Sequence, residues 1–254
     1  MSARRRFRGL LHRAFLRSGV DVTPLSSARH PLGRRLRLLA ALDVDLLVDV
    51  GANAGQFGME MRTGGYRGRI LSIEPLGDAF GRLLTRSQAD VAWTAVRSAV
   101  GASDQELTMH IARNSASSSF LEMLPIHLRA APGTEQVGHE TVPVRRLDSV
   151  LAAHATASRR VYLKIDVQGY ELEVLRGAGE SLRAVVATQL ELSLARLYAN
   201  SPLAHEVDAF VSKLGYRLAG VEPGLAEPDS GRLLQMDGIY VRSDALASLP
   251  GGYS

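Results

Sequence analysis

The residues best suited to chemistry form one short stretch, Asp49-Val50-Gly51-Ala52-Asn53-Ala54-Gly55, followed nineteen residues later by Glu74. The apolar run over residues 46–50 is typical of a buried parallel strand that leads into a tight turn and a helix. Gly51 and Gly55 let the backbone approach a ligand, and the helix after the turn offers unpaired N–H groups. A carboxylate at the end of the next strand, here Glu74, suits a grip on two ribose hydroxyls. The stretch therefore predicts a site for a cofactor that contains a nucleoside.

The spacing of the glycines distinguishes two such cofactors. A dinucleotide site requires G-x-G-x-x-G, because a pyrophosphate must lie against bare backbone at the start of the helix. Here Asn53 and Gln56 stand where the second and third glycines are needed. Asp49 would repel a pyrophosphate, but it could accept a hydrogen bond from an ammonium group, directly or through water. S-adenosylmethionine has an ammonium group, a ribose and no phosphate, so the turn favours this cofactor over NAD. A turn without any ligand would explain neither Asp49 nor Glu74.

Length and composition set the class of protein. A chain of 254 residues suits a single α/β domain with extensions, and 46% hydrophobic residues are enough to bury a core. The chain has no cysteine, which excludes disulfides, thiolate zinc sites and cysteine nucleophiles. No apolar run is long enough to span a membrane, and the N-terminus lacks the features of a secretory signal. We therefore expect a cytoplasmic protein.

The positive charge of the chain is concentrated at its N-terminus. Residues 1–37 contain ten arginines and one acidic residue and so carry +9, whereas the whole chain carries +4. Within residues 4–17 the apolar side chains share one helical face and arginines fill most of the remainder. Such a basic amphipathic helix could lie on an anionic membrane surface, or it could pack on the domain or fray. We predict a basic N-terminal extension, residues 1–37, that can hold the protein at the inner face of the membrane. The arginines are not part of a recognised nucleic-acid-binding motif, so we expect no nucleic-acid partner.

Strands and helices alternate over the rest of the chain, which favours a parallel sheet. The last two strands have no helix between them and should form a hairpin, so that the final strand runs antiparallel. The expected strands are 46–50, 69–73, 91–97, 161–166, 185–192, 216–221 and 234–241, and the expected helices are 32–42, one after Gly55, 77–87, one from Glu171 to about Gly177, and 204–214.

A long polar segment interrupts this alternation. Leu107, Met109 and Ile111 alternate with polar residues, as do Val142 and Val144, so the two runs could pair as antiparallel strands. The polar residues between them are too many for an ordinary connection in a compact domain, which points to a functional lid, residues 113–140. The serines at 115, 117, 118 and 119 could face a substrate, although a solvated flexible loop explains the segment equally well.

The ordered motifs resemble those of the FkbM-type methyltransferases. They are Asp49-Val50-Gly51-Ala52-Asn53-Ala54-Gly55, Ile73-Glu74-Pro75, Arg146-Leu147-Asp148 and Leu163-Lys164-Ile165-Asp166-Val167-Gln168-Gly169-Tyr170-Glu171. The resemblance covers about residues 38–242, so we place the methyltransferase domain at residues 38–254. It implies a class I, Rossmann-like α/β fold with a seven-stranded, mostly parallel sheet, an antiparallel last strand and helices on both faces. It also implies S-adenosylmethionine-dependent O-methylation, commonly of a sugar or polyketide hydroxyl. The arginine-rich N-terminus and the segment after Asn114 depart from the family core.

Catalytic candidates follow from the chemistry of methyl transfer. An aliphatic hydroxyl needs a group that withdraws its proton, and ligands of such sheets lie beyond the carboxyl ends of the strands. Asp166 ends its strand and is our candidate for the general base or the group that orients the hydroxyl. Lys164 points to the same side of the sheet and should pair with Asp166 or Glu191, which keeps that acid ionised, unless the pair is only structural. The histidines at 110, 127, 139 and 205 are weaker candidates for the base.

The remaining site residues concern metal and cofactor. Asp166 and Glu191 could hold Mg²⁺, but two carboxylates make a thin ligand set, so we predict no metal site. Gly51, Asn53 and Gly55 should contact the methionine end of the cofactor. Three further side chains complete the cofactor list: Glu74 for the ribose, Pro75 beside the adenine and Ser98 at the adenine edge.

The sequence thus predicts an S-adenosylmethionine-dependent O-methyltransferase whose acceptor is a sugar hydroxyl. A deoxysugar on a glycolipid or another glycoconjugate is the favoured acceptor, because a basic N-terminus would bring the enzyme to lipid-borne sugars. The nearest alternative is the same reaction on a polyketide or another small secondary metabolite. Two further alternatives are a nucleotide-binding oxidoreductase and a catalytically inactive module that binds the cofactor.

Overall fold

The computed structural model describes residues 15, 17–19, 23–155 and 158–249. The amphipathic segment predicted at residues 4–17 therefore lies almost entirely outside the described residues. Over the part that is described, no helix is both long enough and apolar enough to cross a membrane.

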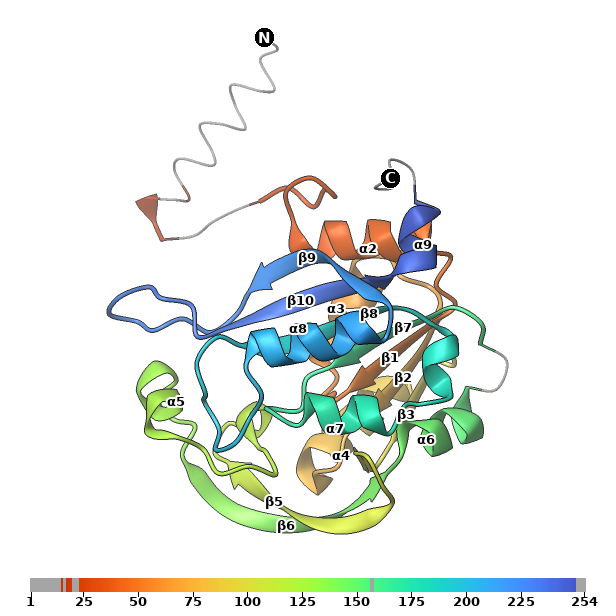
Figure 1. Cartoon of the computed structure of the whole chain (residues 1–254). Coiled ribbons are helices and arrows are strands. Elements are labelled where there is room, and N and C mark those ends of the chain that lie inside the picture. The colour runs from red at the N-terminus through yellow and green to blue at the C-terminus, as the bar shows by residue number, and fades with distance from the viewer. Residues whose placement is uncertain (1–14, 16, 20–22, 156–157, 250–254) are drawn as a thin grey trace.

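A seven-stranded sheet forms the centre of the domain, in the order β3-β2-β1-β7-β8-β10-β9 (Figure 1). Its strands are β1 (Leu46–Val50), β2 (Arg69–Ile73), β3 (Trp93–Val96), β7 (Val161–Ile165), β8 (Val185–Ser193), β9 (Tyr216–Pro223) and β10 (Gln235–Arg242). The five strands from β3 to β8 pair in parallel, whereas β10 pairs antiparallel to both β8 and β9. The predicted fold class, including the reversed last strand, is confirmed.

Helices cover both faces of this sheet. On one face lie α6 (Leu147–His154), α7 (Glu171–Arg176) and α8 (Ala204–Lys213), which bury Leu151, Val174 and Val207 against the strands. On the other lie α2 (Pro31–Ala41), α3 (Gln56–Thr63), α4 (Gly77–Ser87) and α9 (Ser243–Ala247). Leu47 and Val48 of β1 illustrate the alternation, because they belong to the cores on opposite faces.

A smaller sheet closes the end of the domain at which the parallel strands finish. It consists of β4 (Ala99–Val100), β6 (Gln136–Arg145) and β5 (Gln105–Ala112), and in Figure 1 β5 and β6 arch across the bottom of the molecule. Leu107 pairs with Val142 in an antiparallel ladder, as the alternation of the sequence predicts. Met109, Val142 and Val144 form a small core with Leu76 and Ala79.

The structure differs from the sequence prediction in four places. The third strand is only Trp93–Val96, and α6 was not predicted, although its buried Leu147, Val150 and Leu151 have helical spacing. The expected lid, residues 113–140, contains the short 3₁₀ helix η1 (Ser115–Ser117), the helix α5 (Pro125–Ala130) and the start of β6. Helix α2 crosses residue 37, where the extension was expected to end, and its Leu32 and Leu39 are buried. The domain core therefore includes residues from α2 onward.

Candidate active site

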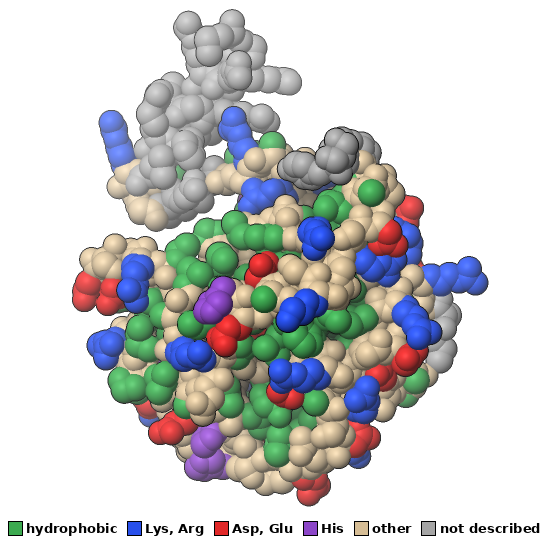
Figure 2. Space-filling view, in the orientation of Figure 1, with side chains coloured by type: hydrophobic (Ala, Val, Ile, Leu, Met, Phe, Trp, Pro, Cys, Tyr) green, Lys and Arg blue, Asp and Glu red, His purple; other side chains and the backbone are tan. Residues whose placement is uncertain are grey.

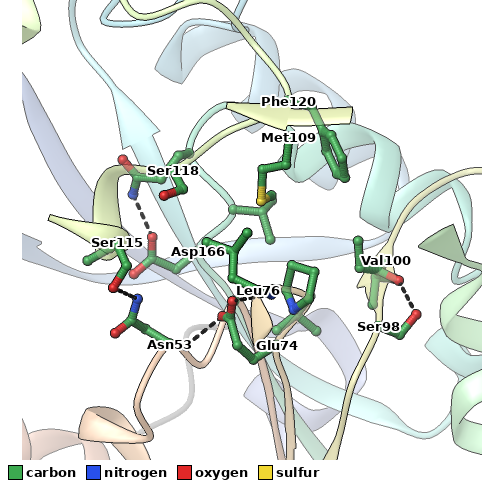
Figure 3. A pocket seen from close by; sticks show the side chains of 17 residues that line it. Asn53, Glu74, Leu76, Ser98, Val100, Met109, Ser115, Ser118, Phe120 and Asp166 are labelled. Carbon is green, nitrogen blue, oxygen red and sulfur yellow. Dashed lines mark hydrogen bonds between the residues drawn. The ribbon is translucent and has the colours of Figure 1, made fainter. Parts of the chain in front are cut away.

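A cavity of about 490 Å³, partly open to solvent, lies where β1, β2 and β7 end beneath the small sheet (Figure 3). Figure 3 shows Asn53, Ser115 and Asp166 on one side and Ser98 and Val100 on the other, with the carboxyl group of Glu74 between them. The lining residues are Val50, Gly51, Asn53, Glu74, Pro75, Leu76, Ser98, Ala99, Val100, Met109, Ser115, Ala116, Ser118, Phe120, Asp166, Val167 and Gln168.

The turn after β1 adopts left-handed backbone conformations at Gly51 (φ +80°), Asn53 (φ +46°) and Gly55 (φ +83°). A Cβ atom on Gly51 would lie 1.9 Å from the carbonyl oxygen of Asp166, so only glycine allows β1 and β7 to meet here. A Cβ atom on Gly55 would lie 2.9 Å from the side chain of Leu83, and Gly55 does not line the cavity. The two glycines thus serve the packing of the turn against the protein itself, and Gly51 and Asn53 border the cavity.

Glu74 fixes the turn to the end of β2. Its side chain is buried, and it accepts hydrogen bonds from the backbone N–H groups of Asn53 (2.8 Å) and Leu76 (2.9 Å). Burial raises the pKa of Glu74 to about 7, against the opposing effect of the two N–H groups. Pro75 follows in the cavity wall, and Ser98 donates to the carbonyl oxygen of Ala99 (2.7 Å). All three residues expected near ribose and adenine therefore line the cavity.

Asp49 lies behind the turn and does not line the cavity. It is fully buried, and its strand neighbour in the β1–β7 register is Lys164. The Lys164 Nζ atom lies 3.3 Å from Asp49 Oδ1 and 3.2 Å from Asp166 Oδ2. Burial opposes the charge on Lys164, but the two carboxylates prevail and raise its pKa. The structure therefore joins three predicted site residues in one ion cluster, with Asp166 at its more exposed end.

Gln168 connects Asp166 to Glu191. Its Nε2 atom donates to Asp166 Oδ1 and to Glu191 Oε2, both at 2.8 Å. Its Oε1 atom accepts from the hydroxyl of Tyr198 at 2.8 Å, which fixes the orientation of the amide. Burial and the negative charges of Asp166, Glu171 and Asp237 raise the pKa of Glu191 well above its ordinary value. Asp166 and Glu191 are thus brought together, as predicted, through an amide that the prediction did not single out.

Glu171 shapes the loop that carries these groups. The loop has left-handed backbone at Gln168 (φ +56°) and Gly169 (φ +96°). The buried Glu171 carboxyl accepts from the N–H groups of Val167 (3.2 Å) and Gly169 (3.1 Å), which closes the loop onto the start of α7. Burial raises the pKa of Glu171 to about 7.

The serine-rich segment after Asn114 covers the cavity and is tied to both loops. Ser115 accepts from the side-chain amide of Asn53 at 2.9 Å, and Ser119 donates to the carbonyl oxygen of Gln168 at 2.7 Å. The hydroxyl of Tyr198 also bonds the carbonyl oxygen of Ser117 at 2.9 Å. Ser115 and Ser118 line the cavity, whereas Ser117 and Ser119 attach the segment to the protein.

Two functional residues were missed by sequence reasoning. Gln168 lies inside the K-I-D-V-Q-G motif and could have been found from its position next to Asp166. Tyr198 gave no signal, because it follows β8 in an irregular segment and reaches Gln168 only through the fold.

Histidines and metal ligands contribute little to the cavity. No histidine is among its lining residues. His127 is buried against Tyr198, with the two rings 5.1 Å apart, and burial lowers its pKa. Within the described ranges, no group of three or more His, Cys, Asp or Glu side chains is arranged to hold a metal ion.

The arrangement can orient a hydroxyl group and remove its proton. Asp166 is one-third exposed and lines the cavity, and the Lys164 ammonium lies 3.2 Å from its Oδ2 atom. Glu74 also lines the cavity. Asp237 lies behind this region, where the amide of Gln189 donates to it at 3.1 Å, and burial raises its pKa to about 6.

Comparison with known proteins gives one family and one relative. Residues 49–218 match the family described as the methyltransferase FkbM domain. Over 154 residues the chain is 32% identical to the hexuronic acid methyltransferase AglP of Haloferax volcanii, a match that covers 59% of this chain and 57% of that protein. The chain therefore spans little more than half the length of this relative.

Two solved structures are similar at low identity. The FkbM methyltransferase of Methylobacillus flagellatus KT has a TM-score of 0.46 at 16% identity, over 77% of this chain and 44% of that chain. Fibrillarin of Aeropyrum pernix, solved with bound S-adenosylmethionine, has a TM-score of 0.44 at 12% identity, over 78% of this chain and 66% of that chain. At such scores neither structure bears on the chemistry of this chain.

Proposed function

This chain belongs to the FkbM methyltransferase family, and from that premise we propose that it transfers the methyl group of S-adenosylmethionine to a hydroxyl group of a sugar. The observation that carries the proposal is the cavity whose lining includes both Glu74 and Asp166. Glu74 suits the ribose of an adenosyl cofactor, and Asp166 suits a hydroxyl that must lose its proton.

The residues of the cavity fit the cofactor. Gly51 and Asn53 present backbone without bulk at the methionine end, and Asn53 brings an amide. Glu74 would accept from the ribose hydroxyls, and Pro75, Leu76 and Ser98 would border the adenine. Asp49 would act indirectly, because it reaches this region only through Lys164. Gly55 would hold the turn rather than touch the ligand.

The cofactor supplies an electrophilic methyl group bonded to sulfur. Asp166 would orient the acceptor hydroxyl and take its proton as that oxygen accepts the methyl group. Lys164 would hold the Asp166 carboxylate in position from one side. Gln168 and Glu191 hold the carboxylate in position from the other side. Most of the rate enhancement then comes from alignment of oxygen, methyl carbon and sulfur on one line. No step requires a metal ion.

The lining supports an uncharged sugar as the acceptor. Glu74 and Asp166 are the charged side chains among the lining residues, and both are acidic. A carboxylate on the acceptor would meet no lining cation that could compensate its charge. Apolar side chains at Val100, Met109, Phe120 and Val167 suit the C–H faces of a deoxysugar, which we propose as the acceptor, carried on a glycolipid. The basic N-terminus would place this cytoplasmic enzyme at the inner face of the membrane.

The proposal is tested by methyl transfer from labelled S-adenosylmethionine to a panel of acceptors. The panel contains deoxysugar glycolipids, the matched free glycosides, hexuronides and a macrolide polyketide. Label on the deoxysugars supports the proposal, and label on the macrolide alone supports the polyketide alternative and contradicts it. An Asp166→Asn variant that transfers methyl groups as fast as the wild type would contradict the catalytic role of this residue.

A further inference from the structure

A second and wider groove runs along the opposite edge of the sheet, between α2, the β9–β10 hairpin and α9. Its empty volume is about 2070 Å³, much of it open to solvent, against about 490 Å³ for the cavity at Asp166. Nothing in the proposed methyl transfer uses this groove. The side chains that matter here are Arg34 and Arg37 of α2, Arg217, Leu218 and Val221 of β9, and Leu246 of α9.

Apolar side chains on the edge strand are exposed to solvent. Leu218 and Val221 are 48% and 49% exposed, and Leu246 and Ile239 extend the apolar surface into the groove. In Figure 2 hydrophobic side chains gather across the upper part of the molecule, where Figure 1 places β9. A long exposed edge strand with apolar side chains is unusual for a protein without a partner.

Arginines surround this apolar surface. Arg34, Arg37 and Arg217 are exposed, and none of the three forms an ion pair with a carboxylate in the part of the chain that the structure describes. The one acidic side chain in the groove, Glu222, is bound by the buried Arg35 at 2.5 Å. The three exposed guanidinium groups can therefore meet phosphate oxygens, although that of Arg217 also donates to the carbonyl oxygen of Tyr216 at 3.4 Å.

We propose that this face, defined by Arg34, Arg37, Arg217, Leu218 and Val221, docks on a membrane surface that carries anionic phospholipids. Exposed arginines around leucine and valine side chains have the composition of an interfacial contact, with charge for the headgroups and apolar groups for the acyl boundary. The sequence adds to this charge, because residues 1–33, which precede these arginines in the chain, carry a further +6.

The buried side of the groove is linked to the catalytic cluster through Phe57. The Arg35 guanidinium in the groove wall lies 4.9 Å from the centre of the Phe57 ring, and the Lys164 ammonium lies 5.1 Å from the same centre. One aromatic ring thus separates the groove from the ion cluster of Asp49, Lys164 and Asp166. Docking of this face deepens the proposed function. It rests on that function in one respect, namely that the acceptor sugar is carried on a lipid.

The test is co-sedimentation of the full chain with vesicles, measured without cofactor or acceptor. One set of vesicles contains equal parts of phosphatidylglycerol and phosphatidylcholine, and the other contains phosphatidylcholine alone. The wild type should bind the first set and not the second. The variant R34Q/R37Q/R217Q should bind anionic vesicles roughly fivefold less tightly for each arginine removed. The control R129Q/R183Q/R232Q removes the same charge from exposed positions outside the groove and should bind much as the wild type does.

A second variant separates the docking face from the N-terminal segment. L218D/V221D leaves all arginines in place and should also weaken binding, because it removes the apolar part of the contact. The inference is overturned if both groove variants bind anionic vesicles as tightly as the wild type. It is also overturned if deletion of residues 1–20 abolishes all binding and the groove substitutions change nothing. If Leu218 and Val221 instead mediate self-association, light scattering will show a dimer that L218D/V221D abolishes, with no vesicle binding, and the inference is wrong. Methyl transfer to a free glycoside tests the proposed function separately.

Discussion

Gln168 holds Glu191 with the same amide nitrogen that donates to Asp166, at 2.8 Å in both bonds. Two carboxyl groups that share one donor lie close together, and ionising both is costly in a buried site. Lys164 forms an ion pair with Asp166, and burial raises the pKa of Glu191. The pair therefore divides its roles: Asp166 lines the cavity, where it can meet a hydroxyl group, and Glu191, whose protonated form burial favours, does not line it.

The first prediction concerns Asp166. Asp166→Asn keeps the size of the side chain but removes the base, so kcat should fall by about 10²–10⁴-fold. Binding of S-adenosylhomocysteine, measured by calorimetry, should change little. Asp237→Asn, which alters a carboxyl group that does not line the cavity, is the matched control and should retain most of the activity. Equal losses in both variants would argue for a general structural effect.

The second prediction concerns Gln168. Gln168→Glu replaces the shared donor by a third carboxyl group, which should raise the pKa of the pair and lower kcat by about tenfold or more. The rising limb of the pH–rate profile should move to higher pH. Gln168→Leu should lower kcat without that displacement, because it adds no charge. A profile that is the same in wild type and Gln168→Glu contradicts the division of roles.

The fold was largely predictable, because hydrophobic periodicity specifies buried strands such as Leu46–Val50 and Arg69–Ile73 directly. Helix α6 was not predicted, because its apolar positions closely follow the strand that ends the lid segment. The hairpin of β9 and β10 was visible from the missing helix between them.

The site was only partly predictable. Asp49, Lys164 and Asp166 could be assigned to one region because alternate residues of a strand share a face, and β1 and β7 both end at the site. Their pairing depends on the β1–β7 register, which the sequence does not state. Tyr198 and Ser115 are brought to the site by irregular segments, so no periodicity could locate them. Gly55 was expected at the ligand, but the tight contact it makes is with Leu83 inside the protein.

The third prediction uses the buried Glu171. Its pKa is about 7 in the folded protein against an ordinary 4.5, so the folded state keeps a proton that the unfolded state loses as pH rises. The contribution of Glu171 to stability is therefore complete below pH 4.5 and is lost as pH rises through about 7. Glu171→Gln can still accept the N–H groups of Val167 and Gly169 and never ionises. Relative to wild type, it should gain up to about 3 kcal/mol in free energy of unfolding between pH 5 and pH 8.

Urea unfolding of both proteins at the two pH values measures this difference. Glu180→Gln, at an exposed position, is the control and should show little change with pH. A difference between Glu171→Gln and wild type that stays constant from pH 5 to pH 8 would show that Glu171 is ionised in the folded protein at both.

The fourth prediction concerns the charge of the acceptor. The side chains that line the cavity include Glu74 and Asp166 and no cation. A neutral deoxysugar glycoside should therefore be methylated with a kcat/KM at least about tenfold above that of its matched hexuronide, a difference of roughly 1.4 kcal/mol. Competition between the two acceptors in one reaction measures the ratio. Preference for the hexuronide would contradict this account of specificity while leaving methyl transfer to sugars intact.

The central claim is that the turn after β1 and the carboxyl group of Glu74 hold an adenosyl cofactor. Calorimetric titration of the purified full chain with S-adenosylhomocysteine tests it most directly. The account predicts saturable binding that Glu74→Ala weakens by about 10- to 100-fold, since a hydrogen-bonded carboxylate is lost, and no binding of NAD. Clean binding of NAD together with no heat from S-adenosylhomocysteine would contradict it.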